Sequence, residues 1–580
     1  MKGNWMRTRI LTFLLVVLCR VTTSSSAETL SVLDLVSDEV AFCLEIPDLD
    51  TKWTELDKSP LMARLRAFPA IQKVLDGNGF QRWMTLNDLT EKKSGQPLSM
   101  YLRALFARSV VVAIYVPPQG APQGILVGEA RDAAAIQEFF QTWNMLEPKH
   151  VTTTRLHRGL RYKHRKRHAD TDEELYFASS DRWFAITDQE GLIQGVIDRF
   201  IVATATTPEP YAANTLRFSP AFIRNRARLK PGCAAYVHIN ARPWDRSLQE
   251  FSQAENDPLG PAAIWKNVSC VSASVSLKDG IVCDSIVDLD SKSLPKSWPQ
   301  FVATAKAEPS WKGRLPADAI LAVSGHLELA PLVQLVINQI PAESRAEIAK
   351  IRRVAQSFLR GRDLIDTVLP AMSRDFSAFL VTRADAQGKK VVVDGAFRSH
   401  LNAPADPQMV SDISRGMETT MTLLAAYFSA DTQNIVVAFQ DRNESEFIGW
   451  LSESAPIPLA CGVKQNDLFV AGSRDRAVQS MDLKEPSSDN PRLTEHARRY
   501  FPHANQLIWL DSVQARTAIE RNGGDLAQFF SFGAADAMPR WLSRFEQLRP
   551  TLELVDSLFV AAKIEIDHLH ITFGGGLDTK

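Results

Sequence analysis

The side chains best suited to bind an anion lie in one basic run, residues 155–168. It holds seven lysines or arginines and three histidines: Arg155, Arg158, Arg161, Lys163, Arg165, Lys166, Arg167, His157, His164 and His168. Cations at this density could hold a polyanion such as nucleic acid, an acidic polysaccharide or a lipid headgroup. Four carboxylates follow directly, at positions 170, 172, 173 and 174, and the run lies between two predicted strands. We therefore predict a solvated hairpin tip that these acids neutralise, with polyanion binding through residues 155–168 as the alternative.

Two histidines near the carboxyl end have a spacing that metal ligands use. His568 and His570 would place both imidazoles on one face of a strand, beside Asp567. Zinc needs a third or fourth ligand at about 2 Å, and the sequence offers none. Asp567-His568 stands where the first half of the chain has a turn, Lys278–Gly280, so we expect a polar turn. The glycines 574–576 have no helix after them to hold a phosphate, and we expect them to fray.

The sequence contains no recognisable catalytic or cofactor motif. Phosphate-binding loops, dinucleotide fingerprints, nucleophile elbows, zinc-protease motifs and Cys-x-x-Cys pairs are all missing. We therefore predict no catalytic residue, no cofactor-binding residue, no metal ligand and no cofactor. A Ser/His/Asp site assembled from distant segments stays open, because geometry and not chain order defines such sites.

The cysteines do not have the pattern of a disulfide framework. Five follow the leader described below, at positions 43, 233, 270, 283 and 461. Cys270 and Cys283 flank a predicted hairpin, but its register places Cys283 opposite Val275 and Cys270 near Asp288. A bridge needs Cα atoms within about 7 Å, so we predict free, buried thiols.

The first 27 residues have the composition of a secretory signal peptide. Lys2, Arg7 and Arg9 precede a ten-residue apolar core, Ile10 to Cys19, and small residues lead to Ala27. We expect cleavage near Ala27 and export to the periplasm or beyond, with an uncleaved anchor as the alternative. Cleavage would change the formal net charge from −1 to −5 by removing four cations. A chain with this mildly acidic net charge has no general attraction to nucleic acid. We expect a partner in the envelope or another protein, and no membrane span after the leader.

One local pattern occurs twice in the chain, at residues 181–198 and 466–482. Each copy begins with a polar turn, Asp181-Arg182 or Asn466-Asp467, and continues into a short strand. An N-cap residue, Asp188 or Ser473, then precedes an amphipathic helix.

Further elements recur in the same order, at offsets between about 268 and 289 residues. They are a strand (39–46 and 319–325), a hairpin (109–128 and 377–396), a helix (136–143 and 413–428), a strand (233–239 and 507–510) and a closing hairpin (270–288 and 557–573). Ser59-Pro60 and the capping box Ser344–Glu347 open two more helices, the second with Ile348, Ile351, Val354 and Phe358 on one side. In the strand 271–277, valine and alanine alternate with serine, which predicts a half-buried strand.

This order predicts an α+β protein of two similar lobes from an internal tandem duplication, each a mostly antiparallel sheet with packed helices. A proline-rich stretch, residues 291–317, marks the boundary. The expected organisation is a signal peptide (1–27), a first lobe (28–295) and a second lobe (296–580).

The layout resembles a family of bacterial secreted or envelope proteins with a domain of unknown function. The matching features are the leader, the opening Leu315-Pro316-Ala317-Asp318 before a strand, and the strand Asp467–Ala471 before a short helix. The first opening, Val36-Ser37-Asp38, lacks the proline. The resemblance implies an exported envelope protein and no activity, cofactor or site.

The sequence favours a non-enzymatic envelope protein with a binding or structural role. Its ligand would lie between the lobes or on a helix-free sheet face. The alternative is a hydrolase of envelope polymers whose site is assembled from distant residues. An enzyme should bring polar residues with shifted pKa values together in a cleft, whereas a binding protein should expose an apolar groove or patch.

Overall fold

The computed structural model describes residues 30–147, 150–167, 174–204, 214–246, 265–294, 298–305, 315–326, 359–384, 391–401, 407–429, 437–440, 447–451, 459–464, 466–477, 490–530 and 538–578, with a few single positions between 327 and 358. The predicted leader lies outside these residues, as do Ile348, Ile351, Val354 and Phe358 of the predicted helix. The chain divides into two compact units, unit 1 (1–251 and 268–288) and unit 2 (252–267 and 289–580). The boundary predicted between residues 295 and 296 stays a prediction.

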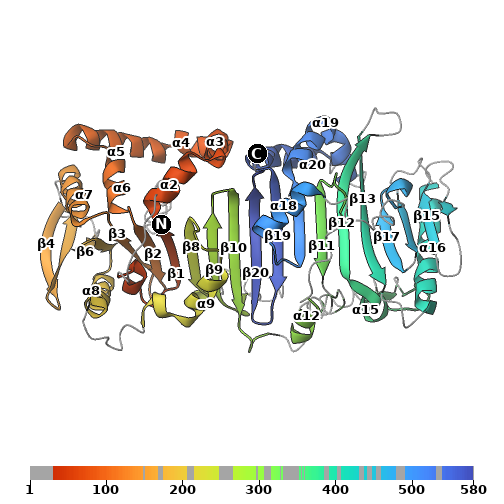
Figure 1. The fold of residues 1–580 in the computed structure, drawn as a ribbon, viewed down its shortest axis with the longest axis horizontal. Coiled ribbons are helices and arrows are strands. Elements are labelled where there is room, and N and C mark those ends of the chain that lie inside the picture. Colours follow the sequence, from red (N-terminus) through yellow and green to blue (C-terminus); the bar gives the residue numbers. More distant parts are fainter. Residues whose placement is uncertain are drawn as a thin grey trace. The chain divides into compact units, whose positions relative to one another are not determined.

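Unit 1 contains a ten-stranded antiparallel sheet (Figure 1). Its strand order is β10-β9-β8-β1-β2-β3-β7-β6-β5-β4. The strands are β1 (Phe42–Pro47), β2 (Ser109–Tyr115), β3 (Gln123–Glu129), β4 (His150–His157), β5 (Leu160–Arg167), β6 (Glu174–Ser180), β7 (Trp183–Thr187), β8 (Ala235–Asn240), β9 (Val268–Ser276) and β10 (Gly280–Leu289).

Helices cover both faces of this sheet, because residues of each strand alternate between two apolar clusters. On one face Ile46, Val110 and Phe184 pack with Leu98, Leu102 and Leu105 of α6. The helices before β4 are α2 (Leu49–Asp57), α3 (Pro60–Ala67), α4 (Pro69–Asp76), α5 (Asn78–Ser94), α6 (Leu98–Leu105) and α7 (Ala133–Leu146). On the other face Cys43, Val111 and Ala185 pack with η1 (Val32–Leu35), α8 (Glu190–Thr204) and α9 (Pro220–Arg228).

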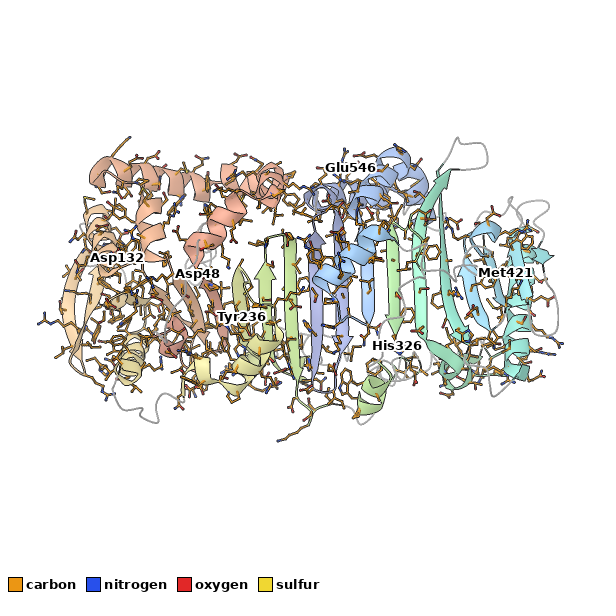
Figure 2. All side chains as sticks on the ribbon, viewed as in Figure 1. Asp48, Asp132, Tyr236, His326, Met421 and Glu546 are labelled. Atoms are coloured by element: carbon orange, nitrogen blue, oxygen red, sulfur yellow. The ribbon has the colours of Figure 1, made fainter. Side chains whose placement is uncertain are left out.

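Short polar side chains cap the first turns of two helices of unit 1. The Ser59 hydroxyl accepts a hydrogen bond from the Met62 N–H at 3.2 Å and caps α3, as predicted. Asp132, labelled in Figure 2, caps α7 in the same way through the Ala135 N–H at 2.8 Å.

Unit 2 contains a second ten-stranded sheet, in the order β20-β19-β18-β11-β12-β13-β17-β16-β15-β14. Adding ten to each strand number of unit 1 reproduces this order. The strands are β11 (Leu321–His326), β12 (Met372–Ala384), β13 (Val391–Leu401), β14 (Val437–Gln440), β15 (Phe447–Leu451), β16 (Ala460–Lys464), β17 (Asp467–Ala471), β18 (Gln506–Asp511), β19 (Ser557–Ile564) and β20 (His568–Gly576).

The helices of unit 2 pack on both faces of its sheet. Its longer helices are α12 (Trp298–Thr304), α16 (Pro407–Ser429), α18 (Pro491–Tyr500), α19 (Ser512–Phe530) and α20 (Met538–Leu554). The Tyr500 ring of α18 stacks on Phe559 of β19, with ring centroids 5.3 Å apart. On the opposite face, α19 and α20 pack with Leu510 and Leu558. Both units are therefore α+β, as predicted.

The pattern that recurs in the sequence folds similarly in both units. Asp181 and Asn466, which open the two copies, have left-handed backbone angles with φ of 51° and 67° and lead into β7 and β17. Ser473 accepts a hydrogen bond from the Arg476 N–H at 3.3 Å and caps its helix, as predicted. The prediction for Asp188 was wrong, since α8 begins at Glu190 and the buried Asp188 Oδ1 has no hydrogen-bond partner.

The half-buried strand predicted at residues 271–277 is confirmed by the alternating burial of β9. Its serine side is the more deeply buried one, since Ser272 and Ser274 are buried while Val271 and Ala273 are only half-buried. The glycines 574–576 do not fray, because they belong to β20. A side chain at position 575 would lie within 2.8 Å of three Val555 atoms, so glycine allows this close approach.

Candidate functional site

The basic run forms two strands, which contradicts the solvated tip predicted from the sequence. Residues 155–157 end β4 and residues 160–167 form β5. Only Arg158 and Gly159 form the turn, and both have positive φ, 46° and 87°. A two-residue turn of this kind matches the twist of the strands, so the hairpin continues almost to its tip.

Most of the basic side chains in this hairpin bind carboxylates from other elements. Nitrogen–oxygen distances are 2.5 Å for Arg155–Glu190, 3.4 Å for Arg158–Asp198, 3.1 Å for Arg165–Glu147 and 2.6 Å for Lys166–Glu174. The Arg165 side chain is buried and lies over the Trp143 ring. Of the four acids that follow the run, only Glu174 is among the described residues. The neutralisation that we predicted therefore comes largely from α8 and residue 147, which the sequence did not indicate.

A polar network between this hairpin, β6 and α8 groups several residues with shifted pKa values. Hydrogen bonds from Arg155 and Tyr162 lower the pKa of Glu190. Hydrogen bonds from Lys166 and Tyr176 lower the pKa of Glu174 to about 2. Burial and the bond to Glu174 raise the pKa of Tyr176 to about 12.

These shifts are unsuited to acid–base catalysis. A general acid or base works best when its pKa lies near the working pH. Here the two carboxyl groups are held ionised and the phenol is held neutral, so each pKa moves away from neutrality. Shifts in this direction are typical of structural ion pairs and hydrogen bonds. The network therefore stabilises the hairpin.

Unit 2 brings a serine, a histidine and an aspartate from distant segments together. The Ser557 Oγ of β19 lies 2.7 Å from Nδ1 of His496 on α18. The His496 Nε2 lies 3.4 Å from Oδ1 of Asp578, within electrostatic reach but without a hydrogen bond. Burial lowers the pKa of His496 and keeps its ring neutral at pH 7. Residue order in the chain gave no sign of this grouping.

The burial of these groups prevents contact with a substrate in this structure. Ser557 and His496 are fully buried. Gly576 packs directly on them, because a Cβ there would lie 3.3 Å from both His496 Cε1 and Ser557 Oγ. A polymer could reach the hydroxyl only after α18 had moved away from the sheet. The arrangement therefore anchors α18 on the sheet.

Unit 1 has a buried polar cluster at the corresponding place. Asn225 of α9, fully buried, lies with its Nδ2 3.1 Å from the Asp288 carboxylate and 3.4 Å from the Cys270 sulfur. Arg224 also binds Asp288, and His238 of β8 lies 2.9 Å from the Ser272 hydroxyl. The buried serine side of β9 is thus explained, because its hydroxyls belong to this cluster.

One sheet face of unit 2 exposes a row of apolar side chains, which we call the apolar band. It consists of Ile508, Val560 and Phe573, on the neighbouring strands β18, β19 and β20. Ile508 pairs with Val560 and Val560 pairs with Phe573, so the three side chains stand next to one another on one face. They remain 50%, 47% and 44% exposed.

Helices cover this face on either side of the apolar band. Along the strands, Leu510 and Leu558 pack under α19 and α20. In the other direction, Phe376 and Ile564 pack against α12. Glu546 on α20 and His326 at the end of β11 mark these two ends in Figure 2. Among the described elements, no helix covers the apolar band, which lies between covered parts of the same face. It matches one of the two ligand positions that the sequence suggested.

The remaining residues singled out in the sequence have structural surroundings. Cys43, Cys233, Cys270, Cys283 and Cys461 are free, as predicted, although Cys233 and Cys283 are only partly buried. His568 begins β20 and its Nδ1 lies 2.8 Å from the Asp567 carboxylate. Within the described ranges, no three His, Cys, Asp or Glu residues come together as a metal site would need.

One open cleft of unit 1, with a volume of about 540 Å³, lies between the loop after β2 and the segment after β8. Its walls are Val116, Pro117, Pro118, Gly120, Pro122, Arg242, Pro243, Asp245 and Arg246. Arg242 binds Asp245 at 3.1 Å, and Arg246 donates to the Pro118 carbonyl at 3.3 Å. The cleft thus has proline walls and paired charges, without a nucleophile among its lining residues.

Comparisons with known proteins add little to this geometry. No protein-family model matches the sequence, and no curated protein matches it. Among solved structures, crystal forms IV and III of TP0453 are similar to this chain with a TM-score of 0.23 and 9% and 10% identity. Each similarity covers 45% of this chain and 81% of TP0453. This distant likeness carries no argument about function, and the predicted envelope family stays a prediction. In the described part of the chain, no helix has the length and apolar character of a membrane span.

Proposed function

We propose that this chain is an exported, non-enzymatic binding protein of the bacterial envelope, which holds an extended apolar group, such as an acyl chain, on the apolar band. The exposed row of Ile508, Val560 and Phe573 is the observation that carries the proposal. Leaving such side chains in water costs about 25 cal/mol for each Å² of apolar surface, and an apolar ligand recovers that free energy. Export rests on the predicted leader.

A binding role is favoured over a hydrolase because the polar groupings are unsuited to catalysis. Glu174 and Tyr176 have pKa values far from neutrality, and Ser557 is buried beneath α18. The apolar band, by contrast, is accessible without any movement of the fold. The hydrolase alternative requires an opening of α18 that exposes Ser557 and His496.

The proposal includes an origin of the two units by tandem duplication, which the matching strand orders support. The segments that contain α9 and α18 align without a gap at an offset of 271 residues, with Pro220 and Pro231 matching Pro491 and Pro502. In this alignment the fully buried Asn225 corresponds to the fully buried His496. After duplication, each unit would have kept a buried polar contact between its helix and the sheet while the residues changed.

Binding to a polyanion is the second candidate, and exposed cations on β5 favour it. Arg161 and Lys163 point to solvent on the hairpin, and Lys163 donates to the Thr154 hydroxyl. Replacing both residues with glutamine should abolish any salt-sensitive retention on heparin. Unchanged retention would exclude this candidate.

Native mass spectrometry of residues 28–580, purified from the natural host, tests the apolar ligand directly. We expect a stoichiometric lipid or other apolar adduct, which should be lost from a variant with Val560→Asp and Phe573→Ser. Leu423→Asp is the matched control, because Leu423 lies on α16 of the same unit and is 51% exposed. An adduct that survives in the band variant, or a bare wild-type mass, would contradict the proposal.

A further inference from the structure

The strand β4 ends the strand order of unit 1 and pairs with β5 alone among the described strands. The pair His157↔Leu160 closes the two-residue turn and is hydrogen-bonded, as pairs next to such turns are. Bonded and non-bonded pairs alternate along an antiparallel ladder. The backbone groups of Thr152, Thr154 and Leu156 therefore point away from β5, toward the open edge.

The edge at β4 lacks the features that protect sheet edges from pairing. Natural edge strands are kept short, carry proline or bulges, or are covered. The pairing of β4 with β5 runs through eight consecutive residues without a bulge, and β4 contains no proline. The long, regular edge at β4 is therefore open to a further strand.

Apolar and β-branched side chains accompany these free backbone groups. Leu156 is 68% exposed and Val151 is 51% exposed. Leu156 is the most exposed large apolar side chain among the described residues. Three threonines, Thr152 to Thr154, lie between them and have high β propensity. The charge in the strand, Arg155, already binds Glu190.

We propose that β4 is a dimerisation edge, which pairs antiparallel with β4 of a second copy of this chain. A twofold axis perpendicular to the sheet pairs each residue with a residue of the second copy whose number differs from its own by zero or an even amount. The edge-facing residues 152, 154 and 156 meet this condition, so they can pair with one another. In the register centred on Thr154, that residue faces Thr154 of the second copy, and Leu156 faces Thr152. Arg155 then faces Thr153, so no like charges oppose each other.

We take a second copy as the partner, because β4 is self-complementary: its edge-facing residues pair with one another and no like charges oppose each other in the register centred on Thr154. Pairing of single strands buries less surface than the 1,200–2,000 Å² typical of stable complexes. We therefore expect a dimer whose fraction rises with concentration through the micromolar range. This inference does not depend on the apolar band, which lies in unit 2.

Sedimentation velocity of residues 28–580 between about 1 and 100 μM tests the dimer. Thr154→Pro removes the edge-facing N–H and leaves the bonds to β5, since proline is tolerated at such edge positions. We expect this variant to keep the wild-type melting temperature and to dimerise at least tenfold more weakly. A wild type that is monomeric throughout, or a proline variant that dimerises equally well, would overturn the proposal.

A cysteine pair of variants tests the register. Thr154→Cys should form a disulfide-linked dimer under mild oxidation, because a bonded cross-strand pair has Cα atoms about 5.5 Å apart. Thr153→Cys is the matched control, since it faces Arg155 of the second copy and should cross-link much more slowly. Equal cross-linking of both variants would exclude the antiparallel pairing of two β4 strands in the register centred on Thr154.

Discussion

The imidazole of His238 should make unit 1 sensitive to mild acid. His238 is 4% exposed, its Nδ1 lies 2.9 Å from Ser272 Oγ, and its ring contacts Phe222 edge-on at 5.4 Å between centroids. Burial lowers the pKa of His238 from 6.5 to about 4 and outweighs the opposing attraction of the Asp288 carboxylate. The folded protein therefore resists a proton that the unfolded chain accepts readily.

The size of the effect follows from this difference in pKa. When the pH falls below 6.5, the unfolded chain takes up the proton first, so stability is complete above that pH. The loss grows until the pH reaches about 4, where the folded state is also protonated. With about 1.4 kcal/mol for each pKa unit, His238 alone should lower the free energy of unfolding by about 2.5 kcal/mol between pH 7 and pH 4.5.

The variant His238→Gln isolates this contribution. Its amide can still hydrogen-bond to the Ser272 hydroxyl but does not titrate. Urea unfolding at pH 7 and pH 4.5 should show a pH-dependent loss about 2.5 kcal/mol smaller in the variant than in the wild type, because all other titrating groups contribute equally to both. Equal losses, or an NMR titration of folded His238 with a midpoint near 6.5, would refute the reasoning.

Two further predictions concern packing in unit 2 and a helix of unit 1. Trp509→Ala should lower the free energy of unfolding by about 3–5 kcal/mol in chemical denaturation, because Trp509 is fully buried, whereas Ile508→Ala on the exposed face should cost under about 1 kcal/mol. Gly575→Ala should cost about 1–3 kcal/mol because its methyl group would press on Val555, while Gly191→Ala, which has open space in α8, should raise the melting temperature slightly. A larger loss of stability in Ile508→Ala than in Trp509→Ala, or in Gly191→Ala than in Gly575→Ala, would show that these contacts do not control stability.

Much of the fold was predictable because local patterns specify strands and caps. The hairpins of β2 with β3 and β19 with β20 agree with their predicted positions, as do α7 and α16. The helices α4 and α5 were missed, since Thr90 is the single buried residue that the structure describes between Pro69 and Ser94. Without a buried side, a helix leaves only a weak periodic signal in the sequence.

The candidate sites were much less predictable. The grouping of Ser557, His496 and Asp578 joins the region of the closing hairpin to the distant helix α18, and the apolar band joins that hairpin to the distant strand β18. No local spacing encodes such neighbours. The position of the basic run was visible in the sequence, but its partners Glu190 and Asp198 were not, because they come from α8.

The sequence by itself determined the recurring hairpins and their helices, the polar turns at Asp181 and Asn466, and the helix cap at Ser473. Each depends on residues a few positions apart, whose backbone preferences act locally. The tertiary structure decided which side of β9 is buried and which strand lies at the edge of the sheet. The alternation of side chains along a strand creates two faces, but it does not specify which face a helix will cover. Burial therefore depends on the elements that pack against the strand.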